Sequence, residues 1–472
     1  MIRDETTITQ NRFRQWHMRT RGSDSRLARN ASLFSTLVAG VSTSMFGDCV
    51  TPAYRLSPSA EDAVLCHFYQ TIIETLSDED PAHYLHTQLP NLYVRSDPGS
   101  ALRLATEAIS YASSPRKRYV QAIKAIEQAI QDPVEVGNDQ TLYAVLLLCG
   151  YETILQDLNT PPAWGAHVDG AAALVKFRSS NEVHSSLSRS MFCFVRKSVV
   201  LGHMQICRPI DKIFTVPDET TSLYERPEDH LIATAAKIPN LQYRSNYLLT
   251  EPQDASKSDI ENLFYSARVL DRELSDWASN ISTTWSYSAA MNIRGPASSK
   301  FTSRQIHRYP NFYTARVWNF YRVSRLIVQS VLLRAISWLP ISMETRPNEF
   351  NKSKIEESSI ELVNDICASV PFLLGHNLSN MKLPATSGGR KQERTSCPEV
   401  EQNGEIRTGR FSLIWPLYVA CSAPSVPEAQ REWMHMQLLL LAEHDESQAH
   451  FMCFTKSQTL LGGAENFRFA CI

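Results

Sequence analysis

The 472-residue chain lacks the features that mark several broad classes of protein. It has no run of about 18 apolar residues, so the sequence predicts no transmembrane helix and no membrane partner. Its N-terminus is polar and rich in arginine, and no apolar stretch followed by small residues marks a secretory signal. With 47 Lys and Arg against 49 Asp and Glu, the formal net charge is −2. The whole chain therefore has no basic field that would drive nucleic-acid or membrane binding.

Disulfide and zinc patterns are also missing. The ten cysteines are scattered, and several lie inside apolar runs, as Cys149 and Cys421 do. This distribution is typical of buried, reduced thiols and not of the disulfide framework of a small secreted protein. No two cysteines have C-x2-C spacing, and no cysteine pair is followed by H-x3-5-H. The sequence therefore predicts no structural zinc site, and we expect no other cofactor.

The motifs of the common enzyme classes do not occur. The chain has no G-x-S-x-G, no H-E-x-x-H, no glycine-rich phosphate loop and no G-x-G-x-x-G. Residues Ser114 to Lys117 match S-x-x-K, but the companion motifs are absent. Without a clustered nucleophile and base, the sequence favours a protein that is not an enzyme.

What the sequence does contain is helical periodicity over most of its length. Residues 118–130 place four apolar side chains on one helix face. These are Tyr119, Ile123, Ile126 and Ile130. A second helix begins near Asp139 and is apolar nearly all round, as a central core helix would be. Further helices are predicted over 164–178, 312–339, 358–374 and 428–444. Strand signals are scarce, so we expect an all-α fold: a large, irregular domain of packed helix pairs with long loops.

The chain divides into an arm and one large domain in this interpretation. Residues 1–30 form a basic N-terminal arm, expected to be disordered or, alternatively, to contact phosphates or act as a nuclear-import signal. The arginines of the arm are Arg12, Arg14, Arg19, Arg21, Arg26 and Arg29. Residues 31–472 form the helical domain, with loops near 214–260 and 384–410, where polar residues, proline or glycine gather.

Few individual residues suggest a site. His167 lies on a helix face, which favours a packed histidine with a satisfied ring nitrogen over a ligand or acid–base group. Glu152 ends an apolar helix, so we expect it to pair with Arg178 or His167, because a buried carboxylate needs a partner. The aromatic residues of 312–338 are interpreted as core; a small-molecule pocket lined by them is the alternative.

Two segments carry a resemblance to a known family. DQTLYAVLLLCGYE (139–152) and WGAHVDGAAALVKFR (164–178) resemble the signature helices of the fungal-specific transcription factor domain. Three further segments, in order along the chain, are more weakly similar to the family: 317–327, 366–371 and 413–420. The residues that match the family pattern, expected to serve as scaffold and not as a reaction centre, are Glu152, Trp164, His167, Gly170 and Arg178.

The resemblance implies the all-helical middle-homology region of a zinc binuclear cluster regulator that acts in the nucleus. Family members normally begin with six cysteines that bind two zinc ions and place a helix in the DNA major groove. Here the first cysteine is Cys49, and no six-cysteine pattern occurs. Direct DNA binding is therefore not expected. The chain is interpreted as a truncated zinc-cluster DNA binder, as a co-regulator, or as a domain that has lost its DNA role.

The functional hypothesis is a transcription regulator or co-regulator of a metabolic or secondary-metabolite gene set. Its expected partners are other transcription regulators or a DNA-binding protein, and a homo- or heterodimer is compatible with its helical surface. The alternative is a pathway enzyme or ligand-binding protein built on a helical scaffold. A pocket with convergent polar groups and a perturbed histidine or carboxylate would favour that alternative.

Overall fold

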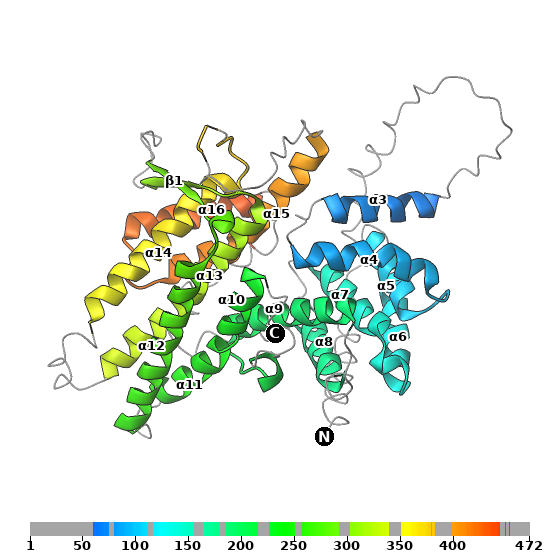
Figure 1. Cartoon of the computed structure of the whole chain (residues 1–472), viewed down its shortest axis with the longest axis horizontal. Coiled ribbons are helices and arrows are strands. Elements are labelled where there is room, and N and C mark those ends of the chain that lie inside the picture. Colours follow the sequence, from blue (N-terminus) through cyan, green and yellow to red (C-terminus); the bar gives the residue numbers. More distant parts are fainter. Residues whose placement is uncertain are drawn as a thin grey trace. The chain divides into compact units, whose positions relative to one another are not determined.

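The structure is a computed structural model and describes most of the chain after residue 59. The described ranges are 60–74, 80–111, 117–154, 164–178, 185–215, 226–250, 256–291, 303–338, 351–378, 380–382 and 399–443, with residues 449 and 453. Within these ranges helices dominate, and the strands are one short pair (Figure 1). The predicted all-α fold is confirmed. The six arginines of the N-terminal arm lie outside the described residues.

The chain forms two compact units, and their boundary falls between Val195 and Arg196, inside one helix. The single domain expected over 31–472 is therefore divided. Unit 1 holds α3 to α8 and the first half of α9. Its elements are α3 (Ala60–Glu74), α4 (Pro81–Arg95), α5 (Ala101–Ser110), α6 (Lys117–Gln131), the short 3-10 turn Glu135–Gly137, α7 (Asp139–Ile154), α8 (Trp164–Arg178) and α9 (Ser186–Ile206).

Unit 1 is built around α7. Every residue from Leu142 to Cys149 is buried, which agrees with the all-round apolar pattern of the sequence. Helices α5, α6 and α8 pack against α7. The Tyr143 hydroxyl donates to the carbonyl oxygen of Leu85 in α4 at 2.8 Å, which satisfies a buried polar group inside this apolar core.

Unit 2 contains the rest of the described chain. Its elements are the second half of α9, the 3-10 turn Lys212–Phe214, α10 (Pro227–Ala235), α11 (Ile238–Thr250), α12 (Lys257–Asn280), the 3-10 turn Thr283–Trp285, β1 (Ser288–Met291), β2 (Gln305–Arg308), α13 (Phe312–Trp338), α14 (Lys352–Leu373), α15 (Glu399–Ser422) and α16 (Glu428–Glu443). The predicted helices at 312–339, 358–374 and 428–444 correspond to α13, α14 and α16. None of the described helices is long and apolar enough to cross a membrane.

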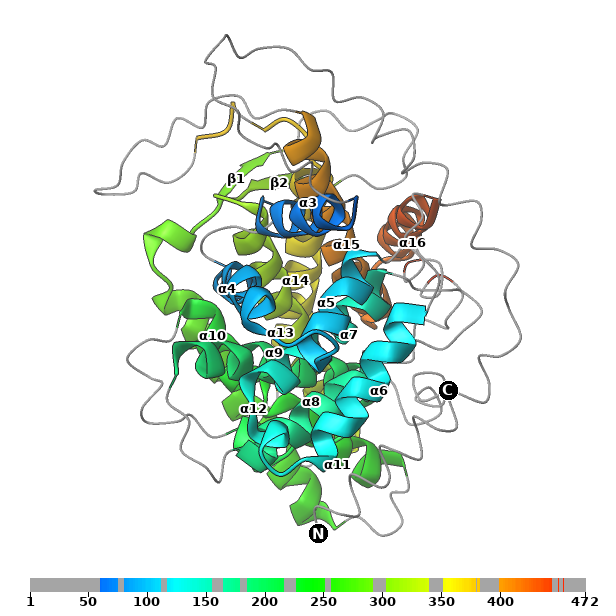
Figure 2. The ribbon, with the colours of Figure 1, turned by 90° about the vertical axis from the view of Figure 1, so that its right-hand side faces the viewer.

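Helix α13 is the centre of unit 2. It packs against α11, α12, α14 and α15, and α13 lies beside α14 in both views (Figure 1 and Figure 2). The antiparallel hairpin of β1 and β2 pairs Ser288 with Arg308, and β2 lies against α14. The residues next to the pair of Ser288 and Arg308 therefore lie beside α13 and α14.

The loop expected over 214–260 is corrected by the structure, because α10 and α11 occupy 227–250 of it. The proline and acidic residues that suggested a loop instead start a helix. Pro227 is the first residue of α10, and Glu228 and Asp229 lie in its first turn. Proline fits the first helical position, and carboxylates there interact favourably with the helix dipole.

The loop expected over 384–410 is likewise wrong for its second half, since α15 begins at Glu399; residues 384–398 lie outside the described ranges. Gly409 was part of the loop signal. A Cβ at Gly409 would lie 2.3 Å from the carbonyl oxygen of Leu373 and 2.7 Å from the ring of Phe312. This glycine permits α15 to approach its neighbours closely and does not mark a turn.

Candidate functional site

His167, the histidine singled out from the sequence, is buried inside unit 1. Its Nε2 lies 3.0 Å from the hydroxyl of Tyr119, and the Tyr119 ring stacks on Tyr151 with centroids 4.5 Å apart. Burial lowers the pKa of His167 to about 4. The imidazole is therefore neutral near pH 7, and its contacts join α8 to α6 and α7.

Arg178 is the second predicted residue with a clear role. It forms an ion pair with Asp139, the first residue of α7, and its Nη2 donates to Ser188 Oγ at 3.2 Å. Ser188 Oγ in turn donates to Asp139 Oδ1 at 2.7 Å. Asp139 accepts these bonds at a helix N-terminus, where negative charge is favoured. The cluster connects the end of α8 to the starts of α7 and α9.

The remaining predicted residues do not join these two in one site. Glu152 is half-buried near the end of α7, and its pairing with Arg178 or His167 stays a prediction. Arg178 contacts Asp139, and His167 contacts Tyr119. Trp164 is the first residue of α8. A Cβ added at Gly170 would meet no atom within 4 Å, so packing does not demand glycine there. The structure thus describes helix-to-helix contacts at these positions.

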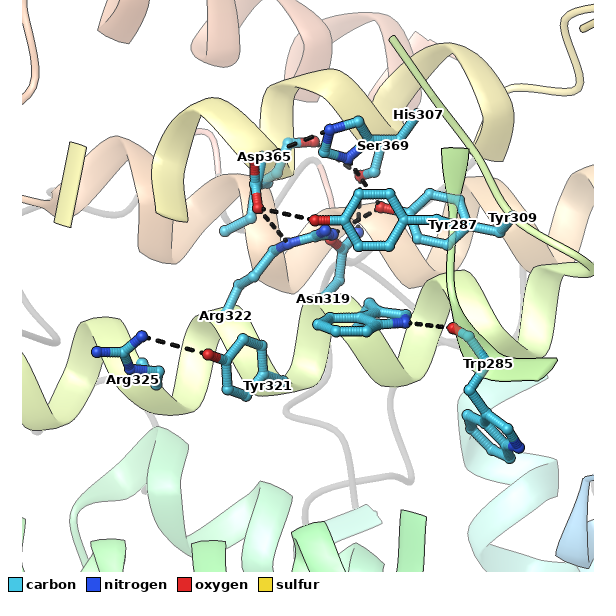
Figure 3. A network of polar contacts seen from close by, with 12 residues as sticks. Trp285, Tyr287, His307, Tyr309, Asn319, Tyr321, Arg322, Arg325, Asp365 and Ser369 are labelled. Atoms are coloured by element: carbon cyan, nitrogen blue, oxygen red, sulfur yellow. Dashed lines mark hydrogen bonds and ion pairs between the residues drawn. The ribbon is translucent and has the colours of Figure 1, made fainter. Parts of the chain in front are cut away.

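The densest polar cluster lies in unit 2 and was not singled out from the sequence. We call it the Arg322 network (Figure 3). Its members from α13 and α14 are Asn319, Arg322, Asp365 and Ser369, and those from the hairpin are Tyr287, His307 and Tyr309. Tyr287 directly precedes β1 and Tyr309 directly follows β2. Because Ser288 pairs with Arg308, the hairpin places the two tyrosine rings opposite each other, with centroids 5.1 Å apart.

Arg322 is the hub of the network and is 0% exposed. Its Nη1 donates to Tyr309 Oη at 2.7 Å and to Asn319 Oδ1 at 2.8 Å. Its Nε lies 3.5 Å from Asp365 Oδ2, which forms an ion pair longer than a hydrogen bond. Asn319 Nδ2 donates to Ser369 Oγ at 2.9 Å. The arginine therefore joins α13 to the hairpin and to α14.

Aromatic rings enclose the guanidinium. Its Cζ lies 5.1 Å from the ring centroid of Tyr287, 5.7 Å from that of Trp318 and 5.8 Å from that of Tyr309. Trp318 is held by a hydrogen bond from its Nε1 to the carbonyl oxygen of Trp285 at 2.8 Å. The faces of aromatic rings attract cations, so these rings replace part of the hydration that Arg322 loses on burial.

The charge states in the network follow from its burial. Burial and the neighbouring Arg322 cation lower the pKa of His307 to about 3. Its Nε2 lies 3.8 Å from Asp365 Oδ1, but the ring is neutral near pH 7 and this contact is not an ion pair. Burial also raises the pKa of Tyr309. Burial opposes the charge of Arg322, but Tyr309 and Asp365 outweigh it and its pKa is raised, so Arg322 remains a cation.

Two further clusters of unit 2 pair charges that are buried or half-buried. One turn beyond Arg322, Arg325 donates from Nε and Nη2 to the two carboxylate oxygens of Asp271, at 2.8 and 3.0 Å. At the start of α10, the Glu228 carboxylate pairs with Lys197 and accepts from Tyr313 Oη at 2.9 Å. Each of these carboxylates has a cation beside it, as burial requires.

The sequence held one signal for the Arg322 network. Asn319 and Arg322 are three residues apart on a helix whose other buried positions are largely apolar, so two polar residues stand on the core-facing stripe. The partners could not be found in that way, because Tyr309 and Asp365 come from other elements. Chemically, the network offers a fixed cation, a neutral imidazole and hydrogen-bond donors. Among the described residues, no group of three or more His, Cys, Asp or Glu could hold a metal ion.

Comparison with known proteins identifies part of the chain. Residues 61–201 match the family model described as the fungal specific transcription factor domain. Transcription factor dbaG of Emericella nidulans is 24% identical over 332 residues, which cover 69% of this chain and 72% of that protein. No solved structure shows a significant match. The family match covers the two segments that carried the resemblance and spans the described helices of unit 1. Residues 61–201 are thus similar to a fungal specific transcription factor domain, and both matches assign the chain a role in transcription regulation.

Proposed function

We propose that the chain acts as a regulator or co-regulator for a metabolic or secondary-metabolite gene set, through its helical domain. The observation that carries the proposal is the family match over residues 61–201. The relative named a transcription factor supports it, because that alignment extends over 332 residues and thus beyond the matched domain. The site of action is the nucleus.

A protein partner provides the contact with DNA in this proposal. The formal net charge of −2 and the absence of a six-cysteine zinc pattern in the sequence support an indirect role. The arginines of the N-terminal arm, Arg12 to Arg29, are the candidates for an import signal or for weak contacts with phosphates.

Regulation is favoured over catalysis by the chemistry of two buried histidines, His167 and His307. Near pH 7 both His167 and His307 are neutral, because burial lowers their pKa values to about 4 and about 3. A general base or acid works best with a pKa near the operating pH. These histidines therefore suit packing and hydrogen bonding within the helical scaffold.

The experiment combines gene deletion with two binding assays. Deletion in the source organism is expected to change the transcripts of a limited gene set, and the tagged full-length chain is expected in the nucleus. A pull-down from nuclear extract should recover a DNA-binding regulator, while the purified chain alone should give no specific gel shift at stated salt. Unchanged transcripts and exclusion from the nucleus would contradict the proposal, and a specific shift by the chain alone would contradict the indirect role.

A matched pair of variants links the phenotype to unit 1. Leu147 is buried in α7, whereas Val134 is 79% exposed in the turn before it. Complementation with Leu147→Asp should fail, because a buried unpaired carboxylate disrupts the core of the matched domain. Val134→Asp introduces the same side chain at the surface and should restore the transcripts.

A further inference from the structure

Exposed aromatic side chains gather on α11 and on the last turns of α13 in unit 2. We call this surface the α11–α13 patch, and its members are Tyr243, Arg244, Tyr247, Arg334 and Trp338. Tyr247 is 74% exposed, Tyr243 52% and Trp338 45%, and these are the three highest values for aromatic side chains among the described residues. Tyrosine, tryptophan and arginine are enriched where proteins bind each other, so the patch has the composition of a contact surface.

A hydrogen bond shows how the two helices meet at the patch. Arg334 Nη1 of α13 donates to Asn246 Oδ1 of α11 at 3.1 Å, and the two helices pack against each other. On a helix, side chains three or four positions apart lie side by side. Tyr243 is three positions before Asn246 and four before Tyr247. Trp338 is four positions after Arg334. Aromatic side chains of both helices therefore lie near Arg334.

Arg334 differs from the other arginines of α13 because it has no carboxylate partner among the described residues. The other three each form an ion pair with an aspartate of another segment. The pairs are Arg316 with Asp80, Arg322 with Asp365, and Arg325 with Asp271. Burial lowers the pKa of Arg334, and the neighbouring Cys207 thiol opposes this effect only in part. Since Arg334 is half-buried, it reaches solvent, and a carboxylate there would compensate its charge.

The charge of the patch defines its partner. Helix α11 contains one arginine and α13 contains four, and neither helix contains Asp or Glu. Arg244 is exposed, lies three positions before Tyr247 and, like Arg334, has no carboxylate partner in the part of the chain that the structure describes. The patch thus has two uncompensated positive charges beside apolar rings. An acidic segment that also carries apolar side chains is complementary to both features.

A protein segment fits the patch better than a nucleic acid does. Affinity for nucleic acids comes largely from Lys and Arg side chains, and it rises with the number of phosphates that they neutralise. The patch offers two such cations, and Arg334 already donates to Asn246. Protein hot spots, by contrast, combine a few Tyr, Trp and Arg side chains in this way.

We propose that the α11–α13 patch binds an acidic segment of a partner protein that also carries apolar side chains. One carboxylate of the segment pairs with Arg334, a second pairs with Arg244, and an apolar side chain packs on the ring of Tyr247. The inference rests on the proposed function only in taking a protein as the partner. Its test measures peptide binding without DNA or transcription, so it can fail while the transcript changes of the proposed function are still observed.

The test measures binding of a short fluorescein-labelled peptide of repeated Asp-Asp-Phe-Leu units to the full-length chain by fluorescence anisotropy. A dissociation constant of roughly 10 to 100 µM is expected for a flexible segment that becomes ordered on binding. The same peptide with Asn in place of Asp should bind about tenfold more weakly, because it lacks both charge pairs. No binding at about 1 mM peptide, or equal binding of the neutral peptide, would overturn the proposal.

Two matched pairs of variants locate the bound peptide. Tyr247→Ala and Arg334→Gln should each weaken binding about tenfold, as the loss of an interface anchor does. Tyr84→Ala and Arg95→Gln make the same changes at exposed residues of α4 in unit 1 and should leave binding unchanged. Because the Tyr247 side chain is largely exposed, its variant stays informative if Arg334→Gln folds poorly. Equal binding by the patch variants and the control variants would show that the peptide binds elsewhere and would overturn the assignment.

Two further measurements test other occupants of the patch. Light scattering gives the mass of the wild-type chain and of Tyr247→Ala, and a dimer that this variant converts to a monomer would assign the patch to a second copy. A single-stranded oligonucleotide that displaces the peptide, and whose binding is lost in Arg334→Gln, would assign the patch to nucleic acid. Either result would overturn the proposal, whereas an unchanged mass and no displacement are the expected results.

Discussion

The two units differ in what their central helices bury. In α7 of unit 1 the buried run from Leu142 to Cys149 is apolar apart from the hydroxyl of Tyr143. In α13 of unit 2 the buried residues include an arginine, an asparagine and a glutamine. These are Asn319, Arg322 and Gln329, and all three take part in hydrogen bonds to other elements.

This difference separates two ways of specifying a core. An apolar core is held by total volume and pattern, and it tolerates many exchanges of similar size. A polar core stabilises only the arrangement in which each donor meets its acceptor, because unmet groups are costly in a low dielectric. The family match lies in the unit with the apolar central helix, whereas the helix that buries an arginine lies in the other unit.

The largest expected effect comes from removing the hub of unit 2. Arg322→Ala should lower the free energy of unfolding by about 3 to 5 kcal/mol, because it removes a large, fully buried side chain and leaves Tyr309 and Asn319 without their donor. Urea denaturation followed by tryptophan fluorescence measures this change, since Trp277, Trp285 and Trp318 lie in unit 2.

A truncation in unit 1 provides the reference for that variant. Leu147→Ala removes a fully buried apolar side chain of α7 and should cost about 2 to 4 kcal/mol by creating a cavity. If Arg322→Ala costs less than about 1 kcal/mol, the polar network contributes little and the contrast between the two cores fails.

A smaller effect on the free energy of unfolding is expected from acid, through one buried histidine in each unit, His167 and His307. His167 and His307 have folded-state pKa values of about 4 and about 3, below the unfolded value of about 6.5. Below pH 6.5 the unfolded chain therefore binds protons that the folded chain does not. Above pH 6.5 each neutral histidine makes its full contribution to the free energy of unfolding. This contribution should fall by about 2 kcal/mol at pH 5, and it should fall further as the pH approaches the folded-state pKa.

Replacing either histidine separates the two contributions. His167→Gln and His307→Gln should each reduce the dependence of the unfolding free energy on pH between 7 and 5, when urea midpoints are compared across that range. Should the pH dependence of both variants equal that of the wild-type chain, the histidines are not held neutral and the assigned directions of their pKa values are wrong.

The smallest effect is expected at the ion pair of unit 1. Asp139→Asn keeps the shape of the side chain but leaves the nearly buried Arg178 without its counter-charge, and should cost about 1 kcal/mol. Glu273→Gln is the matched control, because the pair of Lys237 and Glu273 is exposed and its loss should be close to neutral. Thermal melts followed by circular dichroism give the melting temperature of each variant. Equal decreases in melting temperature would show that burial does not make the pair of Arg178 and Asp139 more stabilising than the exposed pair.

Several elements could be predicted from the sequence because their signals are local. The apolar face of 118–130 predicted α6, and the apolar run after Asp139 predicted α7. Helices α13 and α16 begin at the expected residues, Phe312 and Glu428, and α8 contains Trp164 and His167 as expected. A helical period depends only on neighbours three and four positions apart, so no knowledge of the fold was needed.

The errors share one cause. The acidic residues of 227–229 and the glycine at 409 suggested loops, yet the first group starts α10 and Gly409 permits close packing of α15. Both residue types occur in loops and in helices, and the choice depends on contacts with distant parts of the chain. Glu228, for example, is buried against Tyr313, 85 positions away.

The sequence by itself determined the helical class and the positions of most central helices, and it pointed to the family whose model matches residues 61–201. The tertiary structure decided which polar residues meet. Arg178 contacts Asp139 across 39 positions, and Arg322 reaches Tyr309 only because the hairpin folds back over α13 and α14. Helices form from short-range pattern, whereas a buried charge is stabilised by whichever partners the packing of several elements brings within hydrogen-bond distance.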